Sequence, residues 1–284
     1  MNYSHAFHAG NFADVHKHIV LLALLEHLHK KPTPFFVLDT HAGRGVYDLT
    51  STEAERSGEW RSGISRLLAA PIDVPEVTNY LCHVQHAQAT VATSSSTARF
   101  YPGSPLLIAG QLRNGDRAVF VEKHPLEAEA LKATLHRYSH IAVLTQDGYA
   151  ALKAELPPKE NRGLVLIDPP YEAADEFMQL ADALRMALKR WSNGTYCVWY
   201  PIKAGGAHER FLQQLRAAGI KKLLLVELSV KPADSPLGLN GSGLLIVNPP
   251  YQLDARMQAI LPQLQRVLAL EKVGDVRIEW LAGE

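Results

Sequence analysis

Two short stretches of the chain combine a hydrogen-bond acceptor, a rigid turn and an aromatic ring. Residues 164–171 read LVLIDPPY and residues 244–251 read LLIVNPPY, so each apolar run ends in Asp or Asn, two prolines and a tyrosine. Such an ending suits methylation of an exocyclic amine, a poor nucleophile whose lone pair is delocalised into its base. Acceptors for the two N–H groups orient that lone pair toward a methyl donor, and the tyrosine offers a stacking face. Either stretch could form the site.

In the first stretch, each residue type predicts a role. Asp168 and the backbone carbonyl of Pro169 would accept from the amine N–H groups, and Tyr171 would stack on the base. The prolines fix the backbone and have no N–H group that competes for the acceptors. In-line transfer then depends mostly on positioning, with Asp168 orienting the amine and also able to take the departing proton. The alternative is a Pro-Pro turn that only ends a strand.

Further glycines and carboxylates follow earlier apolar runs. Residues 39–45 read DTHAGRG, and the two glycines let the backbone approach a ligand whose anionic end a helix or turn N-terminus can hold. Glu122 closes a predicted strand, where a carboxylate typically accepts from ribose hydroxyls. Asp147, followed by Gly148, closes the next strand and could accept from an adenine amine. Each residue alone could be solvated or capping, but the order of all three predicts an S-adenosylmethionine site.

Strand and helix patterns alternate along most of the chain and predict a parallel sheet. A helix is expected from residue 11 to about residue 31, and strands at 34–39, 118–122, 141–145, 163–168 and 195–200, with helices between the later strands. Strands at 222–230 and 243–248 have only a Pro/Gly/Ser/Asn-rich loop between them, so they should pair antiparallel. The predicted fold class is α/β: a Rossmann-like class I S-adenosylmethionine-dependent methyltransferase with a seven-stranded sheet and a C-terminal antiparallel hairpin.

One stretch exceeds this minimal plan. About eighty residues separate the first predicted strand from the second, more than a βα unit needs. Residues 46–100 contain helical segments (ISRLLAA and VTNYLCHVQHAQ) and a polar TSSST break. We expect a small helical insertion there that lies beside the site and serves as a lid or binds substrate, with scaffolding alone as the alternative. The methyltransferase core would then comprise residues 1–45 and 101–284.

Strand direction distinguishes the two Pro-Pro-Tyr turns. Ligand sites of open parallel sheets lie at the carboxyl ends of the parallel strands. Asp168 ends such a strand, as do Asp39, Glu122 and Asp147. Asn248 ends the antiparallel strand, so the second turn should lie at the opposite edge as a strand terminator. The catalytic turn is therefore predicted to be the first.

The N-terminal segment is rich in histidine. His5, His8, His16 and His18 could bind a metal by their spacing, but no nearby set of carboxylates or cysteines supports this, and no metal is expected. A solvated helix start is one alternative. Another is that Lys17 and His18 face the cofactor or the substrate from a helix that leans on the site.

Composition indicates a cytoplasmic protein that is not basic overall. Lys+Arg and Asp+Glu both total 29, so a nucleic acid would have to be bound by a local patch. Cys82 and Cys197 are too few for a disulfide framework or a zinc site and are expected to be reduced core residues. The N-terminus has no signal-peptide core, and the apolar run at residues 19–25 is too short to span a membrane.

Over nearly its whole length the chain resembles the RlmJ family, the 23S ribosomal RNA adenine-N6 methyltransferases. The likeness rests on YSHAFHAGNFADVHKH at residues 3–18, LDTHAGRG, YPGSP at 101–105, LIDPPY, WYP at 199–201 and NPPY. It implies a single methyltransferase domain that uses S-adenosylmethionine and carries a helical insertion after the first strand. It further implies a monomer that acts on adenine 2030 of 23S rRNA, naked or before full subunit assembly.

The resemblance also assigns roles at matching positions. Asp168 would be the catalytic acceptor, Tyr3 would contact the RNA, and Lys17 in the same motif could assist, with Tyr171 stacking as above. With Gly43 of the glycine turn added, the expected cofactor-binding residues are His18, His41, Gly43, Ser104, Glu122, Asp147, Gly148 and Asp168. Ser104 and Pro105 also suit the N-cap and first position of a helix.

The motifs leave other functions open, because they identify an amine and not the polymer that carries it. A DNA adenine-N6 methyltransferase or a protein amide-nitrogen methyltransferase would need the same turn. A non-catalytic RNA-binding assembly protein is a further alternative, against which the intact glycines and strand-end carboxylates argue.

Overall fold

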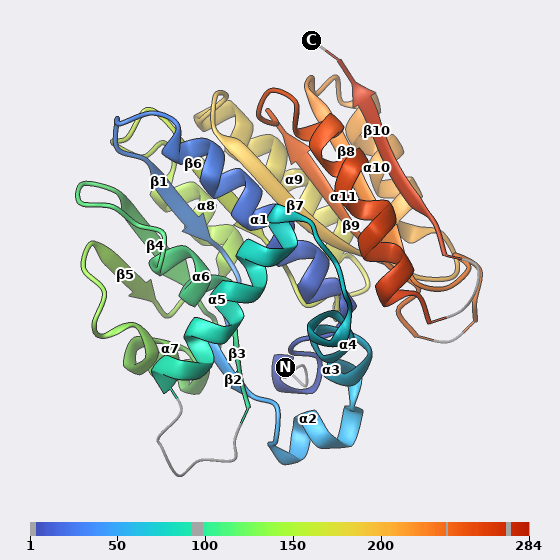
Figure 1. The fold of residues 1–284 in the computed structure, drawn as a ribbon. Coiled ribbons are helices and arrows are strands. Elements are labelled where there is room, and N and C mark those ends of the chain that lie inside the picture. The colour runs from blue at the N-terminus through green and yellow to red at the C-terminus, as the bar shows by residue number, and fades with distance from the viewer. Residues whose placement is uncertain (1–3, 92–98, 237, 271–273, 284) are drawn as a thin grey trace.

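A central eight-stranded sheet organises the chain in the computed structural model, which describes residues 4–91, 99–236, 238–270 and 274–283 (Figure 1). The strands are β1 (Phe36–Asp39), β2 (Val46–Asp48), β3 (Phe100–Pro102), β4 (Arg117–Val121), β5 (Ile141–Leu144), β6 (Gly163–Ile167), β7 (Thr195–Ile202), β8 (Leu223–Ser229), β9 (Gly241–Val247) and β10 (Val276–Ala282). The helices are η1 (His5–Phe7), α1 (Phe12–His29), α2 (Thr52–Ser57), α3 (Glu59–Ser62), α4 (Ile64–Ala69), α5 (Pro75–Val91), α6 (Ser104–Ala109), α7 (Pro125–Leu135), α8 (Gly148–Glu155), α9 (Glu176–Arg190), α10 (Ala207–Ala217) and α11 (Leu253–Leu268).

The strand order of the central sheet is β10-β8-β9-β7-β6-β1-β4-β5. The five strands from β7 to β5 are parallel, and β9 pairs antiparallel with both β7 and β8, which confirms the predicted C-terminal hairpin. The predicted count of seven strands was one short, because β10 pairs antiparallel with β8 at the edge. This strand is half exposed and carries no continuous apolar run, so its residue pattern predicts a strand only weakly.

Alternate strand residues face two hydrophobic layers. Val37 and Leu166 contribute to the layer under α1, α5 and α11, whereas Leu38 and Ile167 contribute to the layer under α8, α9 and α10. Because both faces are covered, β1 and β6 are buried along their whole lengths, as expected of central parallel strands.

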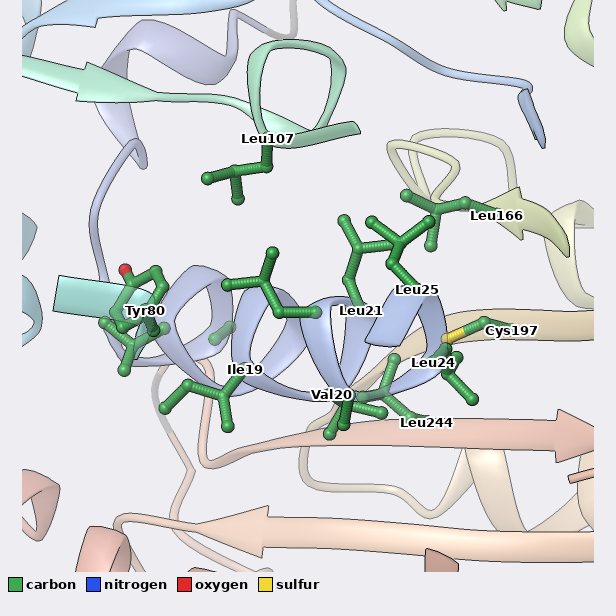
Figure 2. Close-up of a cluster of buried hydrophobic side chains, with 14 of the residues drawn as sticks. Ile19, Val20, Leu21, Leu24, Leu25, Tyr80, Leu107, Leu166, Cys197 and Leu244 are labelled. Atoms are coloured by element: carbon green, nitrogen blue, oxygen red, sulfur yellow. The ribbon is translucent and has the colours of Figure 1, made fainter. Parts of the chain in front are cut away.

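Helix α1 is buried on nearly all sides. Its N-cap is Asn11, as predicted, with the side chain accepting from the backbone N–H groups of Ala13 and Asp14. The helix packs against β6, β9, α5 and α6. Figure 2 shows Leu25 pointing toward Leu166 and Val20 toward Leu244, on opposite sides of the helix. A helix held in this way can carry polar residues to the site in a fixed orientation.

The predicted insertion begins and ends at a two-stranded antiparallel sheet. Val46 pairs with Pro102 and Asp48 with Phe100, so β2 and β3 form its stem and α2 to α5 lie between them. Trp60 and Tyr80 of these helices share one hydrophobic cluster with α1. The division of the chain into core and insertion stays a prediction, and its TSSST segment lies outside the described residues.

The structure bears on two predictions made from the sequence, one about the cysteines and one about membrane-spanning segments. Cys197 is buried and burial raises its pKa to about 12, but Cys82 is exposed on α5, so the prediction that both are core residues was wrong for Cys82. In the described part of the chain, no helix is both long enough and apolar enough to cross a membrane.

The burial of α1 leads to a stability prediction. Leu24 is 2% exposed, so Leu24→Ala should lower the free energy of unfolding by about 2–5 kcal/mol, measured by urea denaturation. Leu126 on α7 is 74% exposed, and Leu126→Ala should stay within about 0.5 kcal/mol of the wild type. Equal losses in the two variants would contradict the packing described for α1.

Candidate active site

The carboxyl ends of β1, β4, β5 and β6 open into a cavity of about 710 Å³. The residues that line it come from the loops after these strands and from the start of α1, α6 and α8. Of the predicted site residues, the cavity wall contains Lys17, His18, His41, Gly43, Ser104, Glu122, Asp147, Gly148 and Asp168. Further wall residues include His5, Tyr47, Tyr149 and Pro170. Residues far apart in the sequence thus meet at one edge of the sheet.

The glycine turn after β1 is tied to the end of β4. Gly43 has φ +63°, and its N–H donates to Glu122 Oε2 at 2.8 Å. A Cβ at this position would lie 2.2 Å from the Tyr47 hydroxyl, so a larger residue does not fit. Glu122 Oε1 accepts from His124 N at 2.7 Å. A carboxylate has about four acceptor positions, so Glu122 can still bind ligand hydroxyls.

Asp147 is both a helix cap and part of the cavity wall. Its Oδ1 accepts from the backbone N–H groups of Tyr149 (3.0 Å) and Ala150 (3.2 Å), and its Oδ2 lies 3.1 Å from Lys123 Nζ. Burial alone would raise its pKa, but the hydrogen bonds from Lys123 and the two backbone groups lower it below the ordinary value. Asp147 therefore offers a fixed, charged acceptor. The adjacent Gly148 is also constrained, since a Cβ there would lie 2.3 Å from Thr40 O.

Ser104 has a different local role from the predicted one. Helix α6 begins at Ser104 with Gly103 as its N-cap, so the prediction of Ser104 as N-cap was wrong by one residue. The Ser104 hydroxyl instead donates to Asp39 Oδ2 at 2.7 Å. Burial raises the pKa of Asp39 to about 7, with the Ser104 hydrogen bond opposing this rise and the charge of Asp168 adding to it. Asp39 thus lies under the cavity as a buried acid.

Lys17 bridges two carboxylates. Its Nζ lies 2.5 Å from Asp168 Oδ2 and 2.9 Å from Asp14 Oδ1, and the residue is 5% exposed. Burial alone would lower the pKa of Lys17, but Asp14 and Asp168 raise it well above its usual range. The ammonium therefore stays charged and holds one oxygen of Asp168.

Asp14 was missed by the sequence reasoning. It is 2% exposed, and its Oδ2 lies 3.0 Å from both His5 Nε2 and Gly10 N. It therefore joins the N-terminal segment to Lys17. The sequence did contain a signal for this contact. Asp14 and Lys17 are three residues apart near the start of a largely apolar helix, and residues with this spacing share a helix face.

Two neutral histidines line the cavity. Burial lowers the pKa of His18 to about 3 and that of His41 to about 4. His18 Nδ1 lies 2.9 Å from the Tyr101 hydroxyl. His41 Nδ1 lies 2.8 Å from Thr40 Oγ1, and the Thr40 hydroxyl donates to Leu166 O, so His41 Nδ1 carries a proton and Nε2 is an acceptor. Both side chains can position a ligand by hydrogen bonding without contributing charge.

The N-terminal histidines do not form one metal group among the described residues. His5 lies against Asp14, His8 Nδ1 lies 3.0 Å from Glu59 Oε1, and His16 Nδ1 lies 3.0 Å from Ser242 Oγ. The described residues with metal-ligand spacing are His208, Glu209 and Glu227, where Arg277 already bridges the two glutamates.

Two predicted residues that the structure describes, Pro169 and Tyr171, do not line the cavity. Tyr171 has φ +53°, its hydroxyl donates to Trp199 O at 2.6 Å, and its ring packs 4.8 Å from that of Phe177. The ring is thus engaged in packing, and Pro170 rather than Pro169 faces the cavity. Tyr3 lies outside the described residues. The stacking and RNA-contact roles predicted for these residues therefore stay predictions.

The second Pro-Pro-Tyr turn lies at the opposite edge, as strand direction predicted. Asn248 follows the antiparallel strand β9, and its Nδ2 donates to Ser192 O and Gly194 O, each at 2.8 Å. Tyr251 is 84% exposed. This turn therefore takes no part in the cavity.

The doubly covered sheet with its antiparallel β9, the glycine turn and the carboxylates at successive strand ends define a class I S-adenosylmethionine-dependent methyltransferase. Residues 32–282 match the family model described as "Ribosomal RNA large subunit methyltransferase D, RlmJ", and the chain belongs to this family.

Relatives match over the full length. Two proteins named "Ribosomal RNA large subunit methyltransferase J" are 41% identical (Haemophilus influenzae) and 39% identical (Escherichia coli) over 285 residues, covering 100% of both chains in each case. A crystal structure of a Legionella pneumophila protein is 36% identical, with a TM-score of 0.84, and covers 96% of this chain and 98% of that one. The predicted family resemblance and fold class are confirmed.

The buried acid predicts a pH dependence of stability. An unfolded Asp has a pKa near 4, so the folded chain binds the Asp39 proton more tightly than the unfolded chain does. This tighter binding stabilises the folded chain at low pH, and the stabilisation is lost as the pH rises toward about 7. Asp39→Asn removes this loss. Its free energy of unfolding relative to wild type should therefore increase by about 1.4 kcal/mol per pH unit between about pH 4 and 7.

Chemical denaturation across this pH range measures the difference. Asp73→Asn, at an exposed position, is the matched control and should give a difference from wild type that does not vary with pH. A flat difference for Asp39→Asn as well would contradict the raised pKa.

Proposed function

We propose that this chain transfers a methyl group from S-adenosylmethionine to the N6 amine of an adenine in 23S ribosomal RNA, and that this adenine is adenine 2030, as the family resemblance implies. The observation that carries the proposal is Asp168, held by Lys17 at the wall of the same cavity as the glycine turn and the strand-end carboxylates. The printed names of the full-length relatives support the choice of ribosomal RNA. We further propose that the chain acts in the cytoplasm as a monomer, on RNA that is naked or not fully assembled.

The cavity fits the methyl donor in size and in chemistry. Its volume of about 710 Å³ lies within the usual range of ligand pockets, and its wall offers carboxylate acceptors and a glycine turn close to one another. Glu122 would accept from ribose hydroxyls, and Asp147 with Gly148 would face the adenine end. His18, His41 and Ser104 would complete the cofactor side. When bound, S-adenosylmethionine supplies the electrophilic methyl group of its sulfonium.

Asp168 would orient the target amine. Lys17 binds Oδ2, which leaves Oδ1 to accept one N6–H. The carbonyl of Pro169 would accept the second, as predicted from the sequence, although Pro170 is the proline that lines the cavity. We assign to Asp168 mainly the orientation of the lone pair, because Lys17 already holds one of its oxygens in place. The proton leaves after transfer, when the nitrogen has become positive and acidic. Asp168 can accept it at that stage.

Lys17 would act on the reaction through Asp168. Two of the three N–H donors of its ammonium are engaged by Asp14 and Asp168, which leaves one for the RNA. The substrate contact predicted for Lys17 is therefore compatible with its positioning role.

The proposal predicts a clear effect of Asp168→Ala. Methyl transfer should fall at least about a hundredfold, because the amine loses its acceptor, while S-adenosylmethionine binding measured by calorimetry largely survives. Asn248→Ala removes the side chain at the corresponding position of the second turn and should keep wild-type transfer. Retained activity in Asp168→Ala with loss in Asn248→Ala would overturn the choice of turn.

The substrate class is tested with tritiated S-adenosylmethionine. The enzyme is offered naked 23S rRNA, assembled large subunits, DNA and a protein extract in parallel reactions. We expect label mainly in naked rRNA, in a single adenine that migrates as N6-methyladenosine after digestion. Label only in DNA or only in protein would contradict the proposed function.

A further inference from the structure

The second Pro-Pro-Tyr turn holds an aromatic side chain in solvent. Asn248 is anchored to two backbone carbonyls, and Asn248 and Gln252 adopt φ +52° and +63° on either side of the turn. Positive φ is uncommon for residues other than glycine, although asparagine adopts it more readily than glutamine, and such conformations are often retained for function. Tyr251 is 84% exposed, more than any other large apolar side chain in the described parts of the chain. The same type of turn that packs the ring of Tyr171 against Phe177 therefore presents Tyr251 outward.

A hollow of about 380 Å³ separates this turn from the end of α1. His27, Lys30, Tyr251 and Arg256 are among the residues that line it. Arg256 forms ion pairs with glutamates of α1 and α5, but Lys30 has no ion-pair partner within the described ranges. The hollow therefore combines an exposed ring with an uncompensated positive charge.

The connection from α1 to β1 extends this positive surface. The Arg162 guanidinium donates to the carbonyls of Leu28, Lys31 (3.2 Å) and Thr33 (3.0 Å), and no carboxylate of the described residues pairs with it. Lys31 is exposed, and its ammonium likewise has no ion-pair partner among the residues described. Arginine thus shapes the loop and keeps its charge at the surface.

Two carboxylates near this edge point inward, and Glu26, whose side chain is 51% exposed, is paired with Arg256. The side chains of Asp116 and Glu160 are 1% and 4% exposed, and they pair with Arg113 and Arg117. Burial, together with Lys30, Arg162 and Lys31, lowers the pKa of His27, as expected where cations gather. In a chain with 29 basic and 29 acidic residues, this edge is locally positive.

We propose that His27, Lys30, Lys31, Arg162 and Tyr251, here named the distal basic patch, bind rRNA at a point away from the methylated adenine. Phosphates would contact the cations Lys30, Lys31 and Arg162, His27 would donate a hydrogen bond as a neutral imidazole, and an unpaired base would stack on Tyr251. The inference rests on the proposed function, since it assigns a second contact for the same RNA. An RNA strand offers phosphates to the surface cations that have no ion-pair partner, and it offers bases to the exposed ring.

The patch and the cavity are joined by one helix. Lys17 lies at the cavity and Lys30 at the patch, thirteen residues along α1, which corresponds to about 20 Å. Figure 1 shows α1 crossing the sheet from the edge near the N-terminus to the opposite edge. A long RNA can reach both places, whereas a stem-loop shorter than about 20 Å that is bound at the cavity cannot. The patch should therefore change RNA affinity and leave the chemical step unchanged.

The test compares a long 23S rRNA fragment with a short stem-loop that contains the target adenine. For Lys30→Ala/Lys31→Ala, the KM for the long fragment should rise about tenfold at physiological salt, and kcat should not change. The slope of log KM against the logarithm of the salt concentration should fall by about 1.5. Tyr251→Ala should raise the same KM roughly fivefold or more, and Tyr251→Phe should restore it because the ring still stacks. The KM for the stem-loop should not change in any of these variants.

Lys153→Ala/Lys189→Ala, at exposed lysines of α8 and α9, is the matched control and should behave as wild type with both RNAs. Wild-type KM and salt dependence in both patch variants, or a change confined to kcat, would overturn the proposal. Filter binding of the long fragment without S-adenosylmethionine measures RNA affinity alone, so it tests the distal basic patch separately from the proposed methyl transfer. Weaker binding by the patch variants would support the patch even if no RNA were methylated.

Discussion

The Lys17 ammonium, placed between Asp14 and Asp168, connects the N-terminal helix to the catalytic end of the parallel sheet. A buried charge is costly unless it is paired and hydrogen-bonded, and here two carboxylates compensate one ammonium at 2.9 and 2.5 Å. Removing Lys17 would leave the two carboxylates without the cation that lies between them. The position of Asp168 therefore depends on a residue that lies about 150 positions earlier in the chain.

Much of the remaining architecture keeps this contact in place. Helix α1 is packed between the sheet and the insertion, and Tyr80 of α5 supports Tyr101, which in turn contacts His18. The insertion thus contributes to the same hydrophobic cluster as the helix that carries Lys17. Asp14 also binds His5 at the cavity wall, so one carboxylate positions both the N-terminal segment and the ammonium.

The sequence was sufficient for features that depend on periodicity and chain direction. Alternating apolar runs predicted the five parallel strands, and their direction placed Asp168 and Asn248 at opposite edges. Features set by long-range packing were not predictable. The ring of Tyr171 turns away from the cavity because Phe177 and Trp199, from α9 and β7, pack against it. The contact of Ser104 with Asp39 and the edge strand β10 likewise depend on partners that no local pattern specifies.

The most direct test of the central contact is a double-mutant cycle on the single-turnover rate of methyl transfer, using Lys17→Met and Asp14→Asn. If Asp14 acts on the reaction through Lys17, the double variant should be no slower than Lys17→Met alone, in proteins that keep the wild-type circular dichroism. If the two losses multiply, Asp14 and Lys17 act independently, and the account of a single bridged ammonium that positions Asp168 is contradicted.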